Sequence, residues 1–407
     1  MIKNPYFKSA TGIYLSYSML GMILIILSSN MPFLTKQFHT DPAGISFLIS
    51  MEGICRSLTL YIAGRLSDKF GRKRFLFLAP LFAIAFLVGI PISPTYQLAM
   101  VVSVFAGISH AFMDAASYPS LMECFPKTPG TATVIIKAFV AIGGIILPII
   151  ITFFVKRSMF YGYTFYVVAA LGVLVFILIA SSKFPDENRT KVVNNDNVLE
   201  DKKFKAEPIL KKEGLALIII GFTSNATFIL FQTWIPTYAQ HILGMSQVSS
   251  LKFISYYSTG ALVSVGILAI LLKKTVKPVF ITLIYPLIGF ILLTILLLFK
   301  TPTIATIAFC LIGMSSAGVL QMAQTTMGEL FWKNKGATIA LVSTASGVAA
   351  AVIPALTGLI LRHYDILHVF YFMIIIYTVG ISCSVLANIR YKRIYGNGED
   401  SISEQVI

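Results

Sequence analysis

The chain has 407 residues, of which 57% are hydrophobic and 12% are charged, and its mean hydropathy is +0.82. Soluble domains carry about 25% charged residues, so the composition excludes a soluble globular protein and predicts an integral membrane protein. The net charge of +15 would suit a nucleic-acid-binding protein, but the cations fall between long apolar runs, as they do in membrane loops. We therefore expect the lipid bilayer, and no nucleic acid, as a partner.

Twelve apolar runs are long enough to cross a bilayer, which takes about 20 residues as a helix. In chain order they cover residues 10–31, 44–63, 75–93, 97–121, 131–155, 163–182, 213–235, 249–272, 278–299, 303–328, 337–361 and 366–389. Because backbone polar groups in lipid must be satisfied within their own segment, each run predicts a helix. The predicted fold class is an all-α membrane protein with twelve transmembrane helices.

The stretch 183–212 separates the first six runs from the last six. It contains eight Lys or Arg residues and two prolines, which predicts a solvated linker. We expect an N-terminal six-helix bundle over residues 1–182, a C-terminal six-helix bundle over 213–389 and a tail over 390–407.

A short basic segment sets the orientation of these spans. Residues 64–74 read GRLSDKFGRKR and carry five cations between the second and third spans. With this segment inside, the inner segments carry 24 Lys and Arg and the outer segments carry six, as the positive-inside rule requires. This predicts a multi-pass protein of a bacterial inner (plasma) membrane, with both termini, the linker and the tail in the cytoplasm.

An internal repeat favours two equivalent halves in the same orientation. Identical residues recur at an offset of 206 positions: Glu123 and Glu329, Phe125 and Phe331, Gly130 and Gly336, Pro148 and Pro354. At a similar offset of 204, Pro32 and Pro236 are expected to close the first and seventh spans.

The basic segment also resembles the loop motif of the major facilitator superfamily, G-x-L-(S/A)-D-(K/R)-x-G-(K/R)-(K/R). The residues that match are Gly64, Leu66, Asp68, Lys69, Gly71, Arg72 and Lys73. The resemblance implies two six-helix repeats, a functional monomer and a secondary transporter that works by alternating access.

The same resemblance implies an inner gate built around this loop. Acids at the inner ends of spans four and ten, Glu123 and Glu329, are expected to pair with loop cations, Glu123 with Arg72 or Arg74. Asp68 is expected to face the start of span eleven near Gly336, where the helix dipole favours an anion. The gate would then comprise Gly64, Asp68, Gly71, Arg72, Arg74, Glu123 and Glu329.

Four charged residues fall within predicted spans of the first half: Glu52, Arg56, Asp114 and Lys137. A charge at the centre of a membrane helix costs about 2.5–3.5 kcal/mol. Arg56, Asp114 and Lys137 lie at similar depth, and Glu52 lies one helical turn deeper. One interpretation is two structural ion pairs, Glu52 with Arg56 and Asp114 with Lys137. The other, which we favour because buried pairs stabilise poorly, is that Asp114 takes up and releases a proton while Lys137 and Arg56 tune it or contact an anionic substrate.

His110 lies four residues before Asp114, on the same helix face, so the sequence allows either a His–Asp relay or a histidine bonded to a carbonyl. The surrounding text, MDAASYP over residues 113–119, resembles span four of fucose–proton-symporter-like members, in which this acid handles protons. WIPTYAQHILGMS, over residues 234–246, is similar to the end of their span seven. That branch also has an acid in span one, and residues 10–31 contain none.

Spans one, four, seven and ten generally line the cavity in this superfamily. By resemblance, the polar candidates there are Tyr14, Tyr17, Asn30, His110, Asn225, Gln232, Trp234, Gln321 and Gln324. Amides and aromatic rings suit a small polar ligand, although each of these residues could instead bond a neighbouring helix.

We predict a proton-coupled secondary transporter of a small polar or anionic metabolite, a sugar or an organic anion. The alternative is a drug–proton antiporter that exports hydrophobic compounds, which span five matches only in Gly143, Gly144 and Pro148. The sequence has no ATP-binding loop and no metal-spaced His or Cys cluster. We therefore expect neither an enzyme nor a cofactor or metal.

Overall fold

The computed structural model describes residues 5–126, 128–185, 206–271, 276–332 and 335–395. Its first half contains α1 (Phe7–Ser29), α2 (Met31–Gln37), α3 (Pro42–Phe70), α4 (Arg72–Ile92), α5 (Tyr96–Cys124), α6 (Pro129–Lys156) and α7 (Gly162–Ala180). Its second half contains η1 (Leu210–Gly214), α9 (Leu215–His241), α10 (Gln247–Leu271), α11 (Pro278–Phe299), α12 (Pro302–Ser316), α13 (Val319–Leu330), α14 (Lys335–His363) and α15 (Ile366–Tyr395). Twelve spans in the described residues are long and apolar enough to cross a membrane, which confirms the predicted number.

Local chemistry explains where several of these helices begin and end. Asp41 and Thr95 accept backbone N–H bonds at the starts of α3 and α5, as N-cap residues do. Gly71 ends α3 with a φ of 97°, a conformation that glycine adopts without steric cost. The chain therefore turns sharply between α3 and α4 inside the basic segment.

The tenth span is not the continuous helix that the sequence predicted. It divides into α12 and α13 at Ala317–Gly318, where Gly318 has a φ of 91°. Ser315 and Ser316 precede the break, but no charged residue interrupts the run over 303–328 and its mean hydropathy stays high, so hydropathy alone does not locate the break.

The prediction that Pro236 closes span seven is also wrong, because α9 continues to His241. Proline has no N–H to donate to the carbonyl four residues earlier, which is that of Gln232. Ser28 of the other half donates its hydroxyl to this carbonyl at 3.2 Å and so satisfies it. Pro32, in contrast, does follow the end of its span.

The repeated residues occupy equivalent places in the two halves. Phe125 ends α5 and Phe331 ends α13, each as the residue that caps its helix. Pro148 and Pro354 both lie inside their helices, α6 and α14. These matches confirm two six-helix repeats, whereas the exact boundaries of the bundles, linker and tail stay predictions, and residues 186–205 and 396–407 lie outside the described part.

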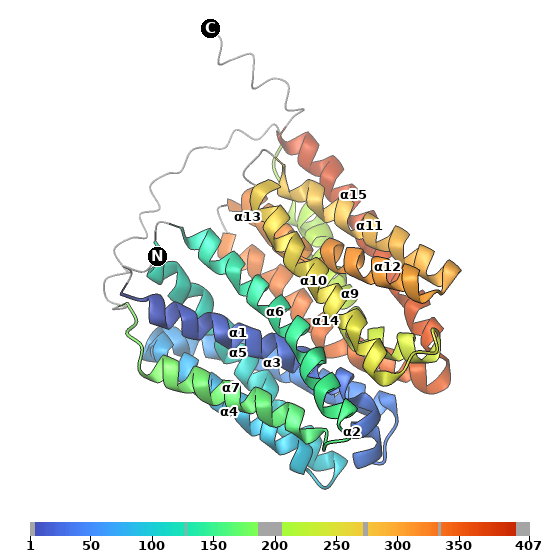
Figure 1. The fold of residues 1–407 in the computed structure, drawn as a ribbon. Helices are drawn as coiled ribbons and strands as arrows, with labels where there is room; N and C mark the ends of the chain where they lie inside the picture. The colour runs from blue at the N-terminus through green and yellow to red at the C-terminus, as the bar shows by residue number, and fades with distance from the viewer. Residues whose placement is uncertain (1–4, 127, 186–205, 272–275, 333–334, 396–407) are drawn as a thin grey trace.

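The two halves lie side by side (Figure 1), and among the described residues their shared apolar core lies toward one end of the molecule. We call the end with the Gly71 turn the motif end and the end with Asp41 and Arg362 the far end. From the middle to the far end, one apolar core joins both halves, with Leu48 of α3 and Ile353 of α14 in the same cluster. At the motif end each half has a separate core.

Small residues allow this close approach at the far end. A Cβ atom on Gly53 of α3 would lie 2.3 Å from the carbonyl oxygen of Ala350 on α14, and one on Gly358 would lie 1.9 Å from Ser46 Oγ. We call the contact surface between the two halves the seam; it includes the contact of α3 with α14 and that of α6 with α10. In the second contact, Gly144 lies against Ser258. The structure is thus closed between its halves at the far end.

Candidate functional site

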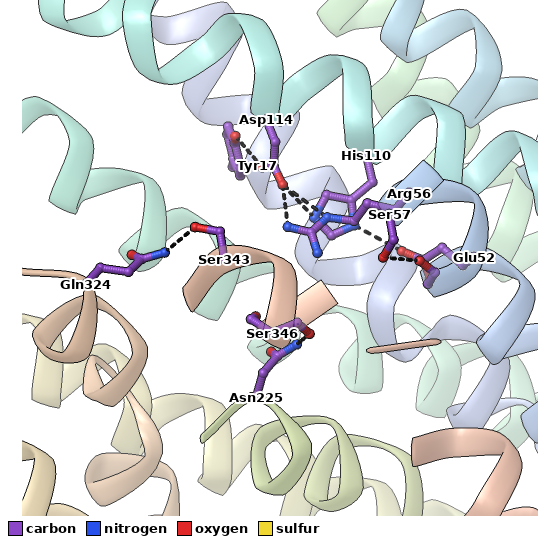
Figure 2. Close-up of polar contacts among 11 residues, drawn as sticks. Tyr17, Glu52, Arg56, Ser57, His110, Asp114, Asn225, Gln324, Ser343 and Ser346 are labelled. Atoms are coloured by element: carbon purple, nitrogen blue, oxygen red, sulfur yellow. Dashed lines mark hydrogen bonds and ion pairs between the residues drawn. The ribbon is translucent and has the colours of Figure 1, made fainter. Parts of the chain in front are cut away.

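A charged cluster lies in the middle of the N-terminal half, on helices α1, α3 and α5. Arg56 donates from Nε and Nη2 to Asp114 Oδ2 at 3.1 and 2.7 Å, and Tyr17 donates to Asp114 Oδ1 at 2.9 Å (Figure 2). The Asp114 and Arg56 side chains are only 13% and 20% exposed. Asp114 is therefore a buried carboxylate held by three hydrogen bonds.

His110 connects this carboxylate to a second one. Its Nδ1 lies 3.1 Å from Glu52 Oε1 and its Nε2 lies 3.5 Å from Asp114 Oδ2 (Figure 2). The predicted His–Asp proximity is therefore present, and the ring faces two carboxylates instead of a backbone carbonyl. An imidazole between two carboxylates can accept a proton on one nitrogen and release one from the other.

The alternative ion pairs, Glu52 with Arg56 and Asp114 with Lys137, are both wrong. Arg56 pairs with Asp114 because α3 and α5 touch directly: a Cβ atom on Gly107 of α5 would lie 2.5 Å from the Glu52 carbonyl oxygen. Lys137 of α6 forms no hydrogen bond or ion pair with any described residue. Its charge nevertheless acts on Asp114.

The predicted cavity residues divide into two groups. Asn225 donates to the carbonyl of Ser346 at 2.7 Å, and Gln324 donates to Ser343 Oγ at 2.9 Å (Figure 2). These amides and Gln321 are partly exposed. The Ser346 site adjoins Gly347, where a Cβ atom would lie 2.8 Å from Ser57 Oγ, so it lies next to the charged cluster.

Apart from His110, the remaining candidates are buried, and several bond other groups of the protein. Asn30 bonds the carbonyl of Ile26 and Trp234 bonds Thr357, and neither has exposed surface. Tyr14 donates to the carbonyl of Ala132 at 3.0 Å, and Gln232 is 7% exposed. Tyr17 is equally buried, but its hydroxyl belongs to the charged cluster.

The predicted gate residues are only partly brought together. Arg72 forms an ion pair with Glu123, which joins α4 to α5 within one half. Glu329 does not meet a loop cation among the described residues; it accepts a hydrogen bond from Tyr391 at 3.1 Å. Around the turn, a Cβ atom on Gly64 would meet no described side chain within 4 Å, and Arg74 is exposed. The Asp68 side chain lies outside the described part.

Two ion pairs between residues far apart in the sequence were not foreseen. At the far end, Arg362 of α14 donates to both carboxylate oxygens of Asp41, at 2.7 and 3.1 Å, and so bridges the halves. These bonds hold the pKa of Asp41 below its ordinary value. At the motif end, the fully buried Glu213 pairs with Arg390 at 2.5 Å. An aspartate before a proline, as in Asp41–Pro42, is typical of a helix N-cap. No sequence pattern indicates that Asp41 also binds Arg362, which is 321 residues away.

Comparison with known proteins identifies the class. The model of the Major Facilitator Superfamily matches residues 13–331. The uncharacterized MFS-type transporter YfkL of Bacillus subtilis is 45% identical over 389 residues, covering 96% of this chain and 98% of the relative. The inner membrane transport protein YdiN of Escherichia coli is 34% identical and covers 96% and 92%. The chain therefore belongs to the Major Facilitator Superfamily and is a multi-pass membrane transporter.

Solved structures share the fold. A D-xylose–proton symporter superposes with a TM-score of 0.75 at 15% identity, covering 94% of this chain and 97% of that one. The inward-open conformation of the Escherichia coli xylose transporter XylE gives 0.73 at 12% identity, covering 94% and 95%. At this identity the likeness concerns the fold alone.

Proposed function

We propose that the protein is a proton-coupled secondary transporter that imports a small polar or anionic metabolite, with its motif end in the cytoplasm. The observation that carries the proposal is the chain Glu52–His110–Asp114, buried halfway along the spans. Ionisable groups at this depth are costly and mark substrate or proton paths. A purely structural role would be served as well by apolar packing.

The order of groups along the membrane normal suits inward proton movement. Glu52 and His110 lie one helical turn, about 6 Å, nearer the far end than Arg56 and Asp114. A proton entering from the far side would reach Glu52 first and pass through His110 to Asp114. Protonation of Asp114 would then weaken its two bonds with Arg56, and this change can bias a two-state equilibrium between conformations.

The lining of the site favours polar cargo. Asn225 of the C-terminal half bonds Ser346 beside the charged cluster, and Gln324 bonds Ser343, about one helical turn away from Ser346 on α14 (Figure 2). Such groups can orient a hydrophilic ligand by hydrogen bonding. Proton symport of a polar solute, as the name of the D-xylose–proton symporter states for that protein, fits this lining better than export of hydrophobic compounds.

The proposal is tested with the purified full-length protein in liposomes that enclose a pH-sensitive dye. We expect an imposed gradient, acid outside, to drive uptake of solutes from a panel of sugars and organic anions, together with protons. We call the chain Glu52–His110–Asp114 the relay. Because Asp114→Asn removes one member of the relay, it should lower this uptake about tenfold or more, as is typical when an acid–base group is lost.

The matched control is Lys252→Gln, which removes an exposed charge at the far end of α10 and should transport normally. Size-exclusion profiles check that both variants are folded. Undiminished gradient-driven uptake by Asp114→Asn contradicts the proposal, as does uptake by the unaltered protein that ignores the pH gradient or is confined to hydrophobic dyes.

A further inference from the structure

We infer that the transported solute is an organic monoanion, that its carboxylate binds Lys137, and that it crosses with one proton and no net charge. The inference rests on the proposed function and specifies the substrate class of the same site. It follows from how the charges of the cluster pair with one another.

Arg56 is already neutralised by Asp114, through two hydrogen bonds to one carboxylate oxygen. Glu52 contacts His110. Among the described residues of the cluster, Lys137 is then the cation that has no direct partner. It lies in a membrane span and is only partly exposed. An ammonium group at this depth is strongly disfavoured unless an anion accompanies it.

The described part of the C-terminal half supplies no such anion. Its acidic residues, Glu213, Glu329 and Asp365, lie at helix ends or in a turn. The groups that it presents beside the cluster are the neutral Asn225 and Ser346, and the amide of Gln324 lies about one helical turn further along α14. A carboxylate from the solute is therefore the charge that would complete the site, and the amides would bond the rest of the molecule.

The net charge of the cluster relates binding of the anion to binding of the proton. With a neutral His110, the two acids Glu52 and Asp114 balance Arg56 and Lys137, so the empty cluster is neutral. One proton added to the relay leaves a net charge of +1, and a bound monoanion restores neutrality. A net charge in a low-dielectric interior is costly. The protein is therefore expected to change conformation most readily when the cluster is neutral, which means either empty or with both the proton and the anion bound.

Other titratable groups around the relay do not alter this count. Tyr17 of α1 and Arg56 of α3 donate to Asp114. Tyr118 of α5 packs against Tyr17, and Lys137 of α6 acts on Asp114 electrostatically. The tyrosine hydroxyls carry no formal charge and do not enter this count. The proton is thus carried by the carboxylates and the imidazole.

The experiment compares charged with neutral solutes in the reconstituted full-length protein. Lactate, gluconate and glucuronate are tested against glucose and xylose, and protein-free liposomes correct for passive entry of weak acids. We expect carboxylate uptake with internal acidification and a rate that is unchanged when valinomycin and K⁺ impose an inside-negative potential. A neutral sugar moving with a proton would instead be accelerated by that potential.

Variants of Lys137 test the assigned residue. Lys137→Gln should lower carboxylate uptake about 10- to 100-fold, the range expected for one charged hydrogen bond, mainly by raising KM. Lys137→Arg should retain most of the uptake, and Lys252→Gln serves as the control for loss of a lysine outside the site.

Three results overturn the inference: proton-coupled uptake of neutral sugars only, stimulation of carboxylate uptake by membrane potential, or full carboxylate uptake by Lys137→Gln. In the first case the proposed proton coupling stands and only the substrate class is wrong. Solute uptake without any proton movement would overturn the proposed function itself. Absence of uptake of every carboxylate in the panel counts against the inference as well.

Discussion

Asp41 performs two tasks at the far end, because it caps α3 through the N–H of Gly44 and binds Arg362 of the other half. Tyr96 is the other titratable group beside it. The hydrogen bond from Arg362 is the largest cause that lowers the pKa of Asp41. The bridge is therefore complete above the ordinary aspartate pKa of about 3.9 and is lost as the pH falls through the lowered value.

This bridge gives a prediction for the separation of the halves. We expect Asp41→Asn to lengthen the mean far-end distance between spin labels on Lys36→Cys of α2 and Lys252→Cys of α10, in a background without the four native cysteines. The parent protein should show a lengthening below about pH 4 that Asp41→Asn, which has already lost the bridge, does not show. An unaltered distance in Asp41→Asn at pH 7, or the same lengthening below pH 4 in this variant, would contradict this role.

At the scale of residues, the sequence was sufficient to predict how deep each charged residue lies in the membrane, but it did not predict which charged residues form pairs. The positions of Glu52, Arg56, Asp114 and Lys137 follow from counting along helices, since each residue advances about 1.5 Å. Which of them meet depends on how closely two helices approach. Gly107 brings α3 against α5, and nothing in the spacing of the charges reveals that contact.

At the scale of elements, hydropathy predicted every span because the bilayer imposes helices of a given length. It missed the break between α12 and α13 and the continuation of α9 beyond Pro236. In the first case glycine adds no polarity to the run. In the second, the compensating hydroxyl of Ser28 comes from another helix, so no local pattern contains it.

The break in span ten leads to a prediction about Gly318. Its φ of 91° is unfavourable for a residue with a side chain, and a Cβ atom there would lie 2.3 Å from Leu268 Cδ1. We expect Gly318→Ala to lower stability by about 1–2 kcal/mol, seen as a lower melting temperature of the purified protein. Gly266→Ala, on α10 with open space around it, should be neutral. Equal melting temperatures for the two variants would show that the turn tolerates a side chain.

At the scale of the molecule, the described structure has one apolar core across both halves from the middle to the far end and two separate cores at the motif end. A transporter that works by alternating access must break the shared core and join the separate ones. We therefore expect the glycine contacts between α3 and α14 to favour the conformation that is closed at the far end, because close packing there requires them.

Gly358 allows this equilibrium to be shifted without touching the charged cluster. In Gly358→Val the new side chain would overlap Ser46 Oγ and crowd the backbone at Ala43, at 1.9 and 3.1 Å from its Cβ. The seam can relieve the overlap by separating at the far end. Spin labels on Lys36→Cys and Lys252→Cys should then move apart, while labels at the motif end, on Arg74→Cys and Lys392→Cys, should move closer. Gly266→Val supplies the matched control. If only the far-end distance changed, the two halves would not rotate as rigid units about the cluster, and the coupling between the two ends would have to arise from movement within each half.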